Sequence, residues 1–434
     1  MTDGPRRTVL RGARWPGDVA FADGRIVAVG EVAALHGDEV VRCDGAIITA
    51  GLVNTHHHLY QWLTRGRAVD CDLFGWLTTL YPVWGRVTAE DVHSAALVGL
   101  AELALSGCTT AADHHYLVPS SDESVFDALA EAAGTVGIRL HLARGSMDLG
   151  ESDGGLPPDH VVEDIDTIMA STQSVASRLH DGERIVVTVA PSSPFTVSPD
   201  LMHQSAVLAR DLGLRLHTHL AETIDEERDA LERYGRRPVD LLDELGWIAG
   251  DVWVAHGIHF NDEEVARLGA AGTGVAHCPS SNARLAAGIC RVADLRAAGA
   301  PVGLGVDGSA SNEVGRLLPE MRQALYAARL RAGRPAAFMP ADALEVATAG
   351  GAACLGRDDI GRLEPGLRAD IVVWPGNDLH DVPDPIDALV LGPDRQARDV
   401  FVGGRAVVAG GQLLGADRPA LRRDLAARAA RLRT

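Results

Sequence analysis

Three consecutive histidines, His56 to His58, stand where a short apolar stretch of the sequence ends. Residues 47–53, rich in isoleucine, leucine and valine, predict a buried strand. Because residues two apart on a strand face the same way, His56 and His58 would point to one interior position while His57 faces away. This spacing suits metal chelation, although a chance histidine run or a core histidine explains the triplet alone equally well. The ends of other strands must therefore supply the deciding ligands.

Four further polar residues follow other strand-like segments. His219 and Glu222 end one such segment, His256 ends the next, and Asp307 ends a later one. Together with His56 and His58, the residues His219 and Asp307 give a set of three neutral imidazoles and one carboxylate. That set suits Zn²⁺, with Fe²⁺ as the chemically close alternative. A structural role is an ordinary explanation of any one of these histidines, but not of so many polar residues gathered at strand ends.

The sequence contains no lysine, so its 40 lysine-plus-arginine residues are all arginine. This excludes a Schiff-base lysine, a phosphate-loop lysine and a carboxylated lysine that bridges two metals. The segment predicted as the fourth strand ends in Ala190, Pro191 and Ser192, without a ligand for a second metal. We therefore predict one catalytic metal ion per subunit.

The predicted site has the groups that hydrolysis requires. A metal with an open coordination position lowers the pKa of water toward about 7, which makes hydroxide available at neutral pH. Glu222 can pass protons to a leaving nitrogen, and Asp307 can accept the proton of the water. His256 can donate to the oxygen that becomes anionic. These three residues are our predicted catalytic groups.

Eight apolar strand candidates alternate with helix-like segments in the middle of the chain. Between them lie segments such as 89–107, 123–137 and 199–213, which have alanine and leucine at helical spacing and glycine at their ends. This count predicts an α/β fold, a (β/α)₈ TIM barrel whose active site lies at the C-terminal ends of the strands. The strand candidates end at residues 55, 113, 145, 191, 222, 257, 277 and 307.

Both ends of the chain predict further strands. Asp23-Gly24 and Asp44-Gly45 lie between apolar runs, which is the pattern of a hairpin turn. Near the C-terminus, the apolar pieces 369–376 and 387–392 and the pieces flanking Gly403-Gly404 have the same style. They indicate a small β-sandwich domain assembled from both termini.

The expected division of the chain has two parts. Residues 1–50 and 361–434 form the composite β-sandwich domain, and residues 51–360 form the metal-dependent hydrolase barrel. The last stretch, 419–434, is rich in arginine, alanine and leucine and predicts a surface helix.

Composition restricts the partners of the protein. A net charge of -19 without a basic patch argues against a nucleic acid polymer and favours a small, weakly charged substrate. Six cysteines without CxxC spacing indicate reduced thiols. No signal pattern and no apolar run of about 20 residues is present, so we expect a cytoplasmic protein with no membrane partner.

Five motifs in this order resemble the amidohydrolase superfamily, in the branch that contains base and triazine deaminases. The resemblance covers the whole chain and implies metal binding by His56, His58, His219 and Asp307, with Glu222 and His256 as catalytic residues. It also implies a composite β-sandwich beside the barrel and frequent homo-oligomers. The motifs are GLVNTHHHL (51–59), HTHLAET (217–223), AHGIH (255–259), HCPSSNARLA (277–286) and LGVDGSASN (304–312).

A narrower resemblance is to 8-oxoguanine deaminases and hydroxydechloroatrazine ethylaminohydrolase-type proteins. It implies that Gln61 and Ser192 contact the substrate, although these relatives carry cysteine in place of Ser192. The amide of Gln61 matches a lactam or urea edge. Arg144 is a further candidate for a substrate carbonyl, although a solvated or ion-paired role is more common for such an arginine. The resemblance is carried by segments 56–65, 113–119, 144–159 and 190–199.

Three hypotheses follow from the sequence. The first is hydrolytic deamination of an amino-substituted purine or pyrimidine-like base, with 8-oxoguanine giving urate and ammonia as the best candidate. The second is an aminohydrolase for another heterocycle, such as isocytosine, a pterin or a hydroxytriazine that loses an alkylamine. The third, a non-catalytic scaffold, is disfavoured because all the expected metal ligands are present.

Overall fold

A closed barrel of eight parallel strands forms the centre of the computed structural model, which describes residues 7–376 and 378–433. The strands follow one another around the barrel in chain order, and the last pairs with the first. They are β6 (Leu52–Asn54), β7 (Cys108–His115), β8 (Arg139–Ser146), β9 (Ile185–Pro191), β10 (Arg215–Leu220), β11 (Val252–His256), β12 (Gly274–His277) and β13 (Val302–Leu304).

The barrel confirms the fold class predicted from the sequence. Each predicted strand has its counterpart, and β7 and β8 are buried along their whole lengths, as expected for parallel strands covered on both faces. The first strand is shorter than predicted, because residues 47–50 form a strand of a different sheet and only Leu52–Asn54 belong to the barrel. The histidine triplet follows in a segment without regular structure, so the strand alternation expected to orient His56 and His58 does not apply there.

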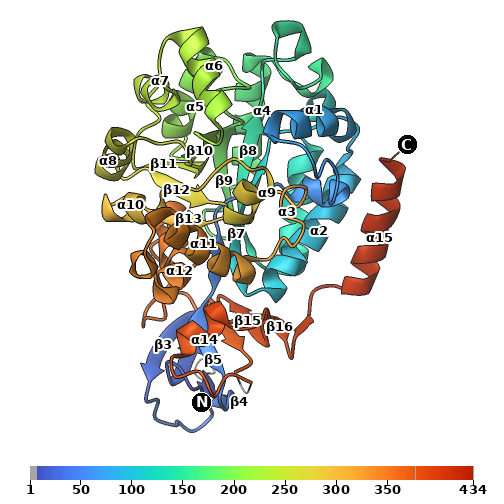
Figure 1. Ribbon diagram of the computed structural model, residues 1–434. Coiled ribbons are helices and arrows are strands. Elements are labelled where there is room, and N and C mark those ends of the chain that lie inside the picture. The colour runs from blue at the N-terminus through green and yellow to red at the C-terminus, as the bar shows by residue number, and fades with distance from the viewer. Residues whose placement is uncertain (1–6, 377, 434) are drawn as a thin grey trace.

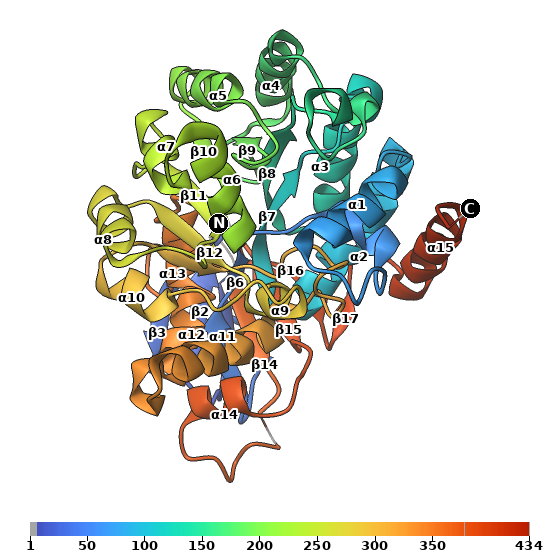
Figure 2. The ribbon, with the colours of Figure 1, turned by 45° about the horizontal axis from the view of Figure 1, so that its top comes forward.

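Helices surround the barrel, as Figure 2 shows. Their starts follow ordinary capping chemistry: Thr88 and Asp91 form a capping box at α2, and Asn261 and Glu264 form one at α8. The α-helices up to the end of the barrel are α1 (Leu73–Trp84), α2 (Ala89–Leu105), α3 (Ser124–Val136), α4 (Ile165–Leu179), α5 (Pro199–Asp211), α6 (Ile224–Tyr234), α7 (Pro238–Glu244), α8 (Asp262–Ala271), α9 (Pro279–Arg284), α10 (Val292–Ala297), α11 (Leu317–Ala332), α12 (Pro340–Val346) and α13 (Ala349–Cys354). Short 3₁₀ helices are η1 (Leu59–Thr64), η2 (Pro119–Ser121), η3 (Glu151–Asp153), η4 (Asp159–Val161) and η5 (Pro335–Ala337).

Two further sheets are built from the chain ends and lie together below the barrel in Figure 1. One has the order β3-β2-β1-β4 and the other the order β17-β16-β15-β14-β5. In the second sheet β5 pairs antiparallel with β14, so the N-terminal and C-terminal parts of the chain share one sheet. The strands are β1 (Thr8–Arg11), β2 (Asp18–Ala22), β3 (Arg25–Gly30), β4 (Glu39–Arg42), β5 (Ile47–Ala50), β14 (Ile371–Trp374), β15 (Asp399–Val402), β16 (Arg405–Ala409) and β17 (Gln412–Leu413).

Two local expectations about these ends are wrong. The turn at Asp23-Gly24 does join the antiparallel strands β2 and β3, but Asp44-Gly45 connects β4 to β5 in different sheets. The apolar piece 387–392, expected as a strand, falls in helix α14 (Pro385–Leu391). Asp384 caps this helix by accepting the backbone N–H groups of Ile386 and Asp387.

The C-terminal helix α15 (Arg418–Arg431) lies beside the barrel helix α2 in both ribbon views. Arg418 donates to the carboxylate of Glu102 on α2 at 2.7 Å, and Arg431 pairs with Asp91 at the start of the same helix. The guanidinium groups of these arginines thus fix the last helix to the barrel rather than to the two sheets.

A buried ion pair connects the bottom of the barrel to the second sheet. Arg139 opens barrel strand β8 and pairs with Asp370, which immediately precedes β14; their side chains are 3% and 1% exposed. The second oxygen of Asp370 accepts the backbone N–H of Gly403 at 2.7 Å in the turn between β15 and β16. We therefore propose that residues 7–50 with 361–376 and 378–417 form one structural unit joined tightly to the barrel, and that α15, expected in the same domain, belongs with the barrel instead. Among the described residues, no helix has the length and apolarity needed to cross a membrane.

We predict that Asp370→Ala destabilises the protein by about 3–5 kcal/mol, because it leaves the Arg139 guanidinium buried without a counter-charge. Urea unfolding followed by circular dichroism measures the change. Arg42→Ala is the matched control, since the Arg42–Asp44 pair is 72% and 63% exposed and its loss should cost no more than about 0.5 kcal/mol. Equal losses for the two variants would show that the buried pair does not join the domains.

Candidate active site

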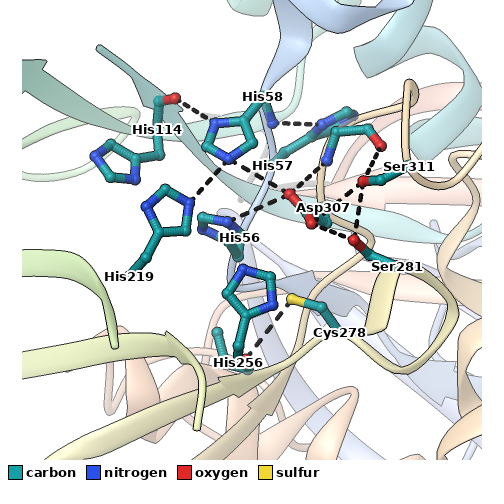
Figure 3. A network of polar contacts seen from close by, with 12 residues as sticks. His56, His57, His58, His114, His219, His256, Cys278, Ser281, Asp307 and Ser311 are labelled. Atoms are coloured by element: carbon teal, nitrogen blue, oxygen red, sulfur yellow. Dashed lines mark hydrogen bonds and ion pairs between the residues drawn. The ribbon is translucent and has the colours of Figure 1, made fainter. Parts of the chain in front are cut away.

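Four predicted metal ligands come together at the C-terminal end of the barrel, as Figure 3 shows. His56 and His58 follow β6, His219 lies on β10, and Asp307 follows β13. The Nε2 atoms of His58 and His219 are 3.1 Å apart. The Oδ1 atom of Asp307 lies 3.4 Å from Nε2 of His56 and 3.4 Å from Nε2 of His58.

Second-layer acceptors fix the tautomer of two ligand imidazoles. Nδ1–H of His58 donates to the carbonyl oxygen of His114 at 2.6 Å, and Nδ1–H of His219 donates to that of Ser192 at 2.6 Å. With the proton on Nδ1, each ring keeps an unshared electron pair on Nε2. Hydrogen bonds of this kind are the usual means by which a protein orients metal-ligating histidines.

The tautomer of His56 is fixed through a second histidine. The Nδ1 atom of His217 is 2.9 Å from the carbonyl oxygen of Trp253, to which it donates, so Nε2 of His217 is an acceptor. That Nε2 lies 2.9 Å from Nδ1 of His56 and accepts a hydrogen bond from the Nδ1–H group. The His217 ring stacks on the Trp253 indole, with centroids 4.5 Å apart. Nε2 of His56 is therefore also an electron-pair donor.

The lone pairs of these three imidazoles converge in a way that favours a bound cation. Burial lowers the pKa of His56 and of His219 and lowers that of His58 to about 3, so all three rings are neutral near pH 7. Two neutral nitrogens 3.1 Å apart with facing lone pairs repel one another, and Nε2 of His56 is buried without a hydrogen-bond partner among the described residues. Two overlapping groups of possible ligands share His56: one adds His58, His114 and His219, and the other adds His256 and Asp307. Imidazole nitrogens with a carboxylate oxygen are a donor set that fits a divalent metal ion.

The carboxylate of Asp307 is held on its far side. Its Oδ2 accepts a hydrogen bond from the Ser281 hydroxyl at 2.5 Å, while Oδ1 accepts the backbone N–H of Gly308 at 2.7 Å and faces the histidines. Asp307 itself has a left-handed backbone, with φ of 60°. Such a conformation in a non-glycine residue is costly and is concentrated at functional sites.

Glu222 and His256 lie beside the ligands. Oε2 of Glu222 is 3.6 Å from Nε2 of His256, and burial raises the pKa of Glu222 to about 8. The backbone N–H groups of Ala221 and Glu222 both donate to the carboxylate of Glu226, at 3.0 and 2.9 Å. Glu222 is thus a buried acid on a fixed backbone.

The resting form of His256 differs from the expected hydrogen-bond donor. Its Nδ1–H donates to Oδ1 of Asn282 at 2.9 Å, and burial lowers its pKa. The neutral ring therefore presents an acceptor Nε2 to the site, so it can donate to substrate only after it has taken up a proton.

A pocket of about 610 Å³, including its open mouth, lies above these groups and reaches Asp307, His58 and His219. Gln61 and Ser192, both predicted to contact substrate, line it. Oε1 of Gln61 is buried without a hydrogen-bond partner among the described residues, and a side chain at Gly308 would lie within 1.8 Å of it.

The structure does not bring Arg144 into this pocket. Its guanidinium is fully buried and donates to Glu163 at 3.0 Å, to the hydroxyl of Ser171 at 2.8 Å and to the carbonyl of Gly145 at 2.7 Å. Arg144 has the ion-paired role that the sequence left open as the commoner alternative. Both terminal nitrogens of the guanidinium are thus engaged within the protein, and the residue does not line the pocket.

Aromatic rings form much of the pocket wall. Trp76, Tyr81 and Tyr116 line it. Trp62 packs beneath the guanidinium groups of Arg65 and Arg422. Phe74 and Phe195, which the sequence analysis did not single out, meet edge to face across the pocket at 4.8 Å between ring centroids.

A barrel with this metal-ligand set at its rim and a protonatable carboxyl group beside it defines a metal-dependent hydrolase. The chain belongs to the amidohydrolase family, whose sequence profile matches residues 47–407. It is 50% identical to an 8-oxoguanine deaminase of Pseudomonas aeruginosa, over 93% of this chain and 92% of that protein. It is 38% identical to a hydroxydechloroatrazine ethylaminohydrolase of Pseudomonas sp. strain ADP, over 84% of this chain and 78% of that protein.

Solved structures give the same family. The zinc complex of an atrazine chlorohydrolase from Arthrobacter aurescens TC1 aligns with a TM-score of 0.91 and 31% identity, over 97% of this chain and 100% of that one. A zinc-bound adenosine deaminase from Xanthomonas campestris aligns with a TM-score of 0.90 and 27% identity, over 99% of this chain and 100% of that one.

We predict that the wild-type protein retains one divalent metal ion per chain and that His219→Ala retains less than a tenth of this amount. The variant removes one of the three imidazole ligands, and the affinity of a site for its metal falls steeply when one protein ligand is lost. Metal content is measured by mass spectrometry after reconstitution with zinc and gel filtration. The matched control is His203→Ala, an exposed histidine on α5, which should bind as the wild type does. Full retention by His219→Ala would remove this residue from the ligand set.

Proposed function

We propose that this protein is a metal-dependent deaminase that hydrolyses the exocyclic amino group of a purine or pyrimidine-like base. The best candidate substrate is 8-oxoguanine, which would give urate and ammonia. One observation carries the proposal: a buried carboxyl group, Glu222, lines one pocket together with His58, His219 and Gln61, whose amide oxygen has no hydrogen-bond partner among the described residues. The 50% identity to an 8-oxoguanine deaminase over nearly the whole chain supports the choice of base.

A divalent metal bound to His56, His58, His219 and Asp307 would supply Lewis-acid activation of water at this point. Zn²⁺ is the metal we propose, because related structures hold zinc and because three imidazoles suit it; Fe²⁺ is the alternative. The single ion per chain follows from the absence of lysine and of a further ligand at Ser192.

The residues of the chain move the protons. With a pKa near 8, Glu222 is largely protonated at neutral pH and can give its proton to the substrate nitrogen as the C–N bond breaks. Nε2 of His256 holds a lone pair and can take a proton from the attacking water, as can Oδ1 of Asp307. The oxygen of the water becomes the new carbonyl oxygen. The proton taken by His256 or Asp307 passes to a ring nitrogen, and the second proton of the water replaces the one that Glu222 gave to the departing ammonia.

The pocket can orient a flat heterocycle. We propose that Gln61 pairs with a lactam or urea edge, since its Oε1 needs a donor and its Nε2 can face an acceptor. The Ser192 hydroxyl lies on the pocket wall, while the carbonyl of the same residue supports His219. Serine and cysteine at this position would leave that carbonyl unchanged and differ only in the group that faces the substrate.

Another heterocycle remains the second candidate. The 38% identity to the ethylaminohydrolase, and 36% identity to an isoxanthopterin deaminase over 96% of this chain, support testing hydroxytriazines and pterins beside isocytosine. A scaffold without catalysis lacks support, since every ligand and acid predicted from the sequence faces one site. We further propose a cytoplasmic location, in keeping with six unpaired cysteines, and a homo-oligomer, which only the family resemblance suggests.

A substrate panel tests the function directly. We predict that zinc-loaded protein releases ammonia from 8-oxoguanine with a higher kcat/KM than from isocytosine, a pterin or guanine, and more efficiently than it releases ethylamine from a hydroxytriazine. Product identity follows from the absorbance and mass of urate. A higher kcat/KM for alkylamine release would transfer the assignment to the second candidate, and no product from any base would overturn deamination.

We predict that Glu222→Gln lowers kcat on the best substrate by at least about 100-fold, because it removes the proton donor of the C–N cleavage. Zinc content should stay at the wild-type level, since Glu222 is not a ligand. Glu232→Gln, an exposed glutamate on α6, is the matched control and should keep wild-type kcat. Near-normal turnover of Glu222→Gln would remove this residue from the mechanism.

A further inference from the structure

The seventh barrel strand, β12, contributes no predicted ligand or catalytic group, yet the short helix that follows it contacts two of them. In α9, Ser281 Oγ lies 2.5 Å from Oδ2 of Asp307, and Oδ1 of Asn282 lies 2.9 Å from Nδ1 of His256. Asp307 follows β13 and His256 ends β11, the two strands that flank β12 in the barrel. Two adjacent residues of one helix therefore contact the Asp307 carboxylate and the His256 imidazole, which come from the two neighbouring strands.

We propose that Ser281 and Asn282 are positioning residues: Ser281 sets which oxygen of Asp307 faces the metal site, and Asn282 sets which nitrogen of His256 faces the substrate. The proposal rests on the function proposed above. Neither residue lines the pocket, so each acts through the side chain that it holds.

The Asp307 carboxylate can rotate, and Ser281 selects one orientation. Ser281 is fully buried, and its hydroxyl lies 2.9 Å from that of Ser311, which in turn is 3.4 Å from Oδ2 of Asp307. Both hydroxyl groups lie on the Oδ2 side, as Figure 3 shows, which leaves Oδ1 directed at His56 and His58. Without the Ser281 hydroxyl, Oδ2 of Asp307 would lose its short hydrogen bond. The Asp307 carboxylate would then no longer be held at one rotation angle.

The His256 imidazole can likewise present either nitrogen as an acceptor, and Asn282 selects one. Asn282 is 2% exposed, so the Nδ1–H group of His256 has no solvent molecule to compete for it at this end of the ring. An acceptor at Nδ1 keeps the proton there and leaves the Nε2 lone pair 3.6 Å from Oε2 of Glu222. Loss of the acceptor would permit the opposite tautomer, in which Nε2 carries the proton.

The two residues that α9 holds both have costly backbone conformations. His256 has φ of 73° and Asp307 has φ of 60°, both in the left-handed region that non-glycine residues rarely adopt. Such a backbone removes these side chains from the regular alternation of a strand. Their directions are consequently set by side-chain hydrogen bonds more than by the strand register.

The helix itself is well fixed, as a positioning element must be. Arg284 at its end donates to the backbone carbonyls of Arg67 and Ala68 at 3.0 and 3.1 Å. At its start, the backbone N–H of Ser280 donates to the buried carboxylate of Glu320 at 3.2 Å. The hydroxyl of Ser280 also hydrogen-bonds Glu320, so α9 contains a second serine–carboxylate contact outside the site.

Zinc affinity tests the role of Ser281. We expect Ser281→Ala to weaken zinc binding by 10- to 100-fold in competition with a chromophoric chelator, the usual effect of losing a partner of a metal ligand. Ser281→Thr, which keeps the hydroxyl, should restore most of it. Ser280→Ala is the matched control, because it removes the same group from the same helix and affects only Glu320; it should bind zinc as the wild type does. Wild-type affinity in Ser281→Ala, or an equal loss in Ser280→Ala, would overturn the assignment.

Asn282 requires different readouts. We expect Asn282→Ala and Asn282→Leu to keep wild-type zinc affinity and KM but to lose at least tenfold in kcat, whereas Asn282→Asp, which keeps an acceptor, regains part of it. In ¹⁵N-histidine NMR spectra, with the His256 signals identified from a His256→Gln sample, the wild type should show a protonated Nδ1 and Asn282→Leu should lose that preference. An unchanged tautomer and kcat in both Asn282→Ala and Asn282→Leu would overturn the role of Asn282.

Failure of this proposal is distinguishable from failure of the proposed function. If the wild type deaminates none of the bases tested, the deaminase assignment fails, while the chelator competition and the NMR spectra still decide whether Ser281 and Asn282 position their partners.

Discussion

Three neutral imidazoles and a carboxylate directed at one buried point are the constraint on which the rest of this structure depends. Lone pairs on nitrogens 3.1 Å apart repel, and burial prevents their relief by protonation. Only a cation makes this arrangement favourable, so the layer behind the ligands must hold them in place for it. The carbonyls of His114 and Ser192 and the His217–Trp253 stack form that layer.

The support for the metal site extends to the closed end of the barrel. The carbonyl of Trp253 accepts a hydrogen bond from Nδ1–H of His217, while its indole donates to the carbonyl of Thr55 at 3.1 Å and packs in a small apolar cluster that includes Val53, Ala112 and Ala276 of other strands. The packing of the barrel interior therefore sets the tautomer of a ligand one step away. A change in that core would reach the chemistry without touching the pocket.

The proposed metal site and the pocket share one residue at the fourth strand. The carbonyl of Ser192 orients His219, and the same residue lines the pocket. Because the first role belongs to the backbone, an exchange of the Ser192 side chain would leave the support of His219 unchanged.

The barrel and the terminal β-rich regions could be predicted from the sequence, and a set of ligands could be proposed from it, because all three follow from hydrophobic periodicity and from residue types that recur at strand ends. The sequence did not determine helix α14, since a short apolar run is ambiguous between strand and helix and only the Asp384 cap and the surrounding packing decide it. It also left open whether Arg144 meets substrate, a question that the position of Glu163 answered. Tertiary structure alone placed Ser281 and Asn282 behind Asp307 and His256, and gave His256 an acceptor nitrogen at rest. A tautomer or a carboxylate angle depends on which atoms from distant segments lie within hydrogen-bond distance, and sequence spacing carries no information about that.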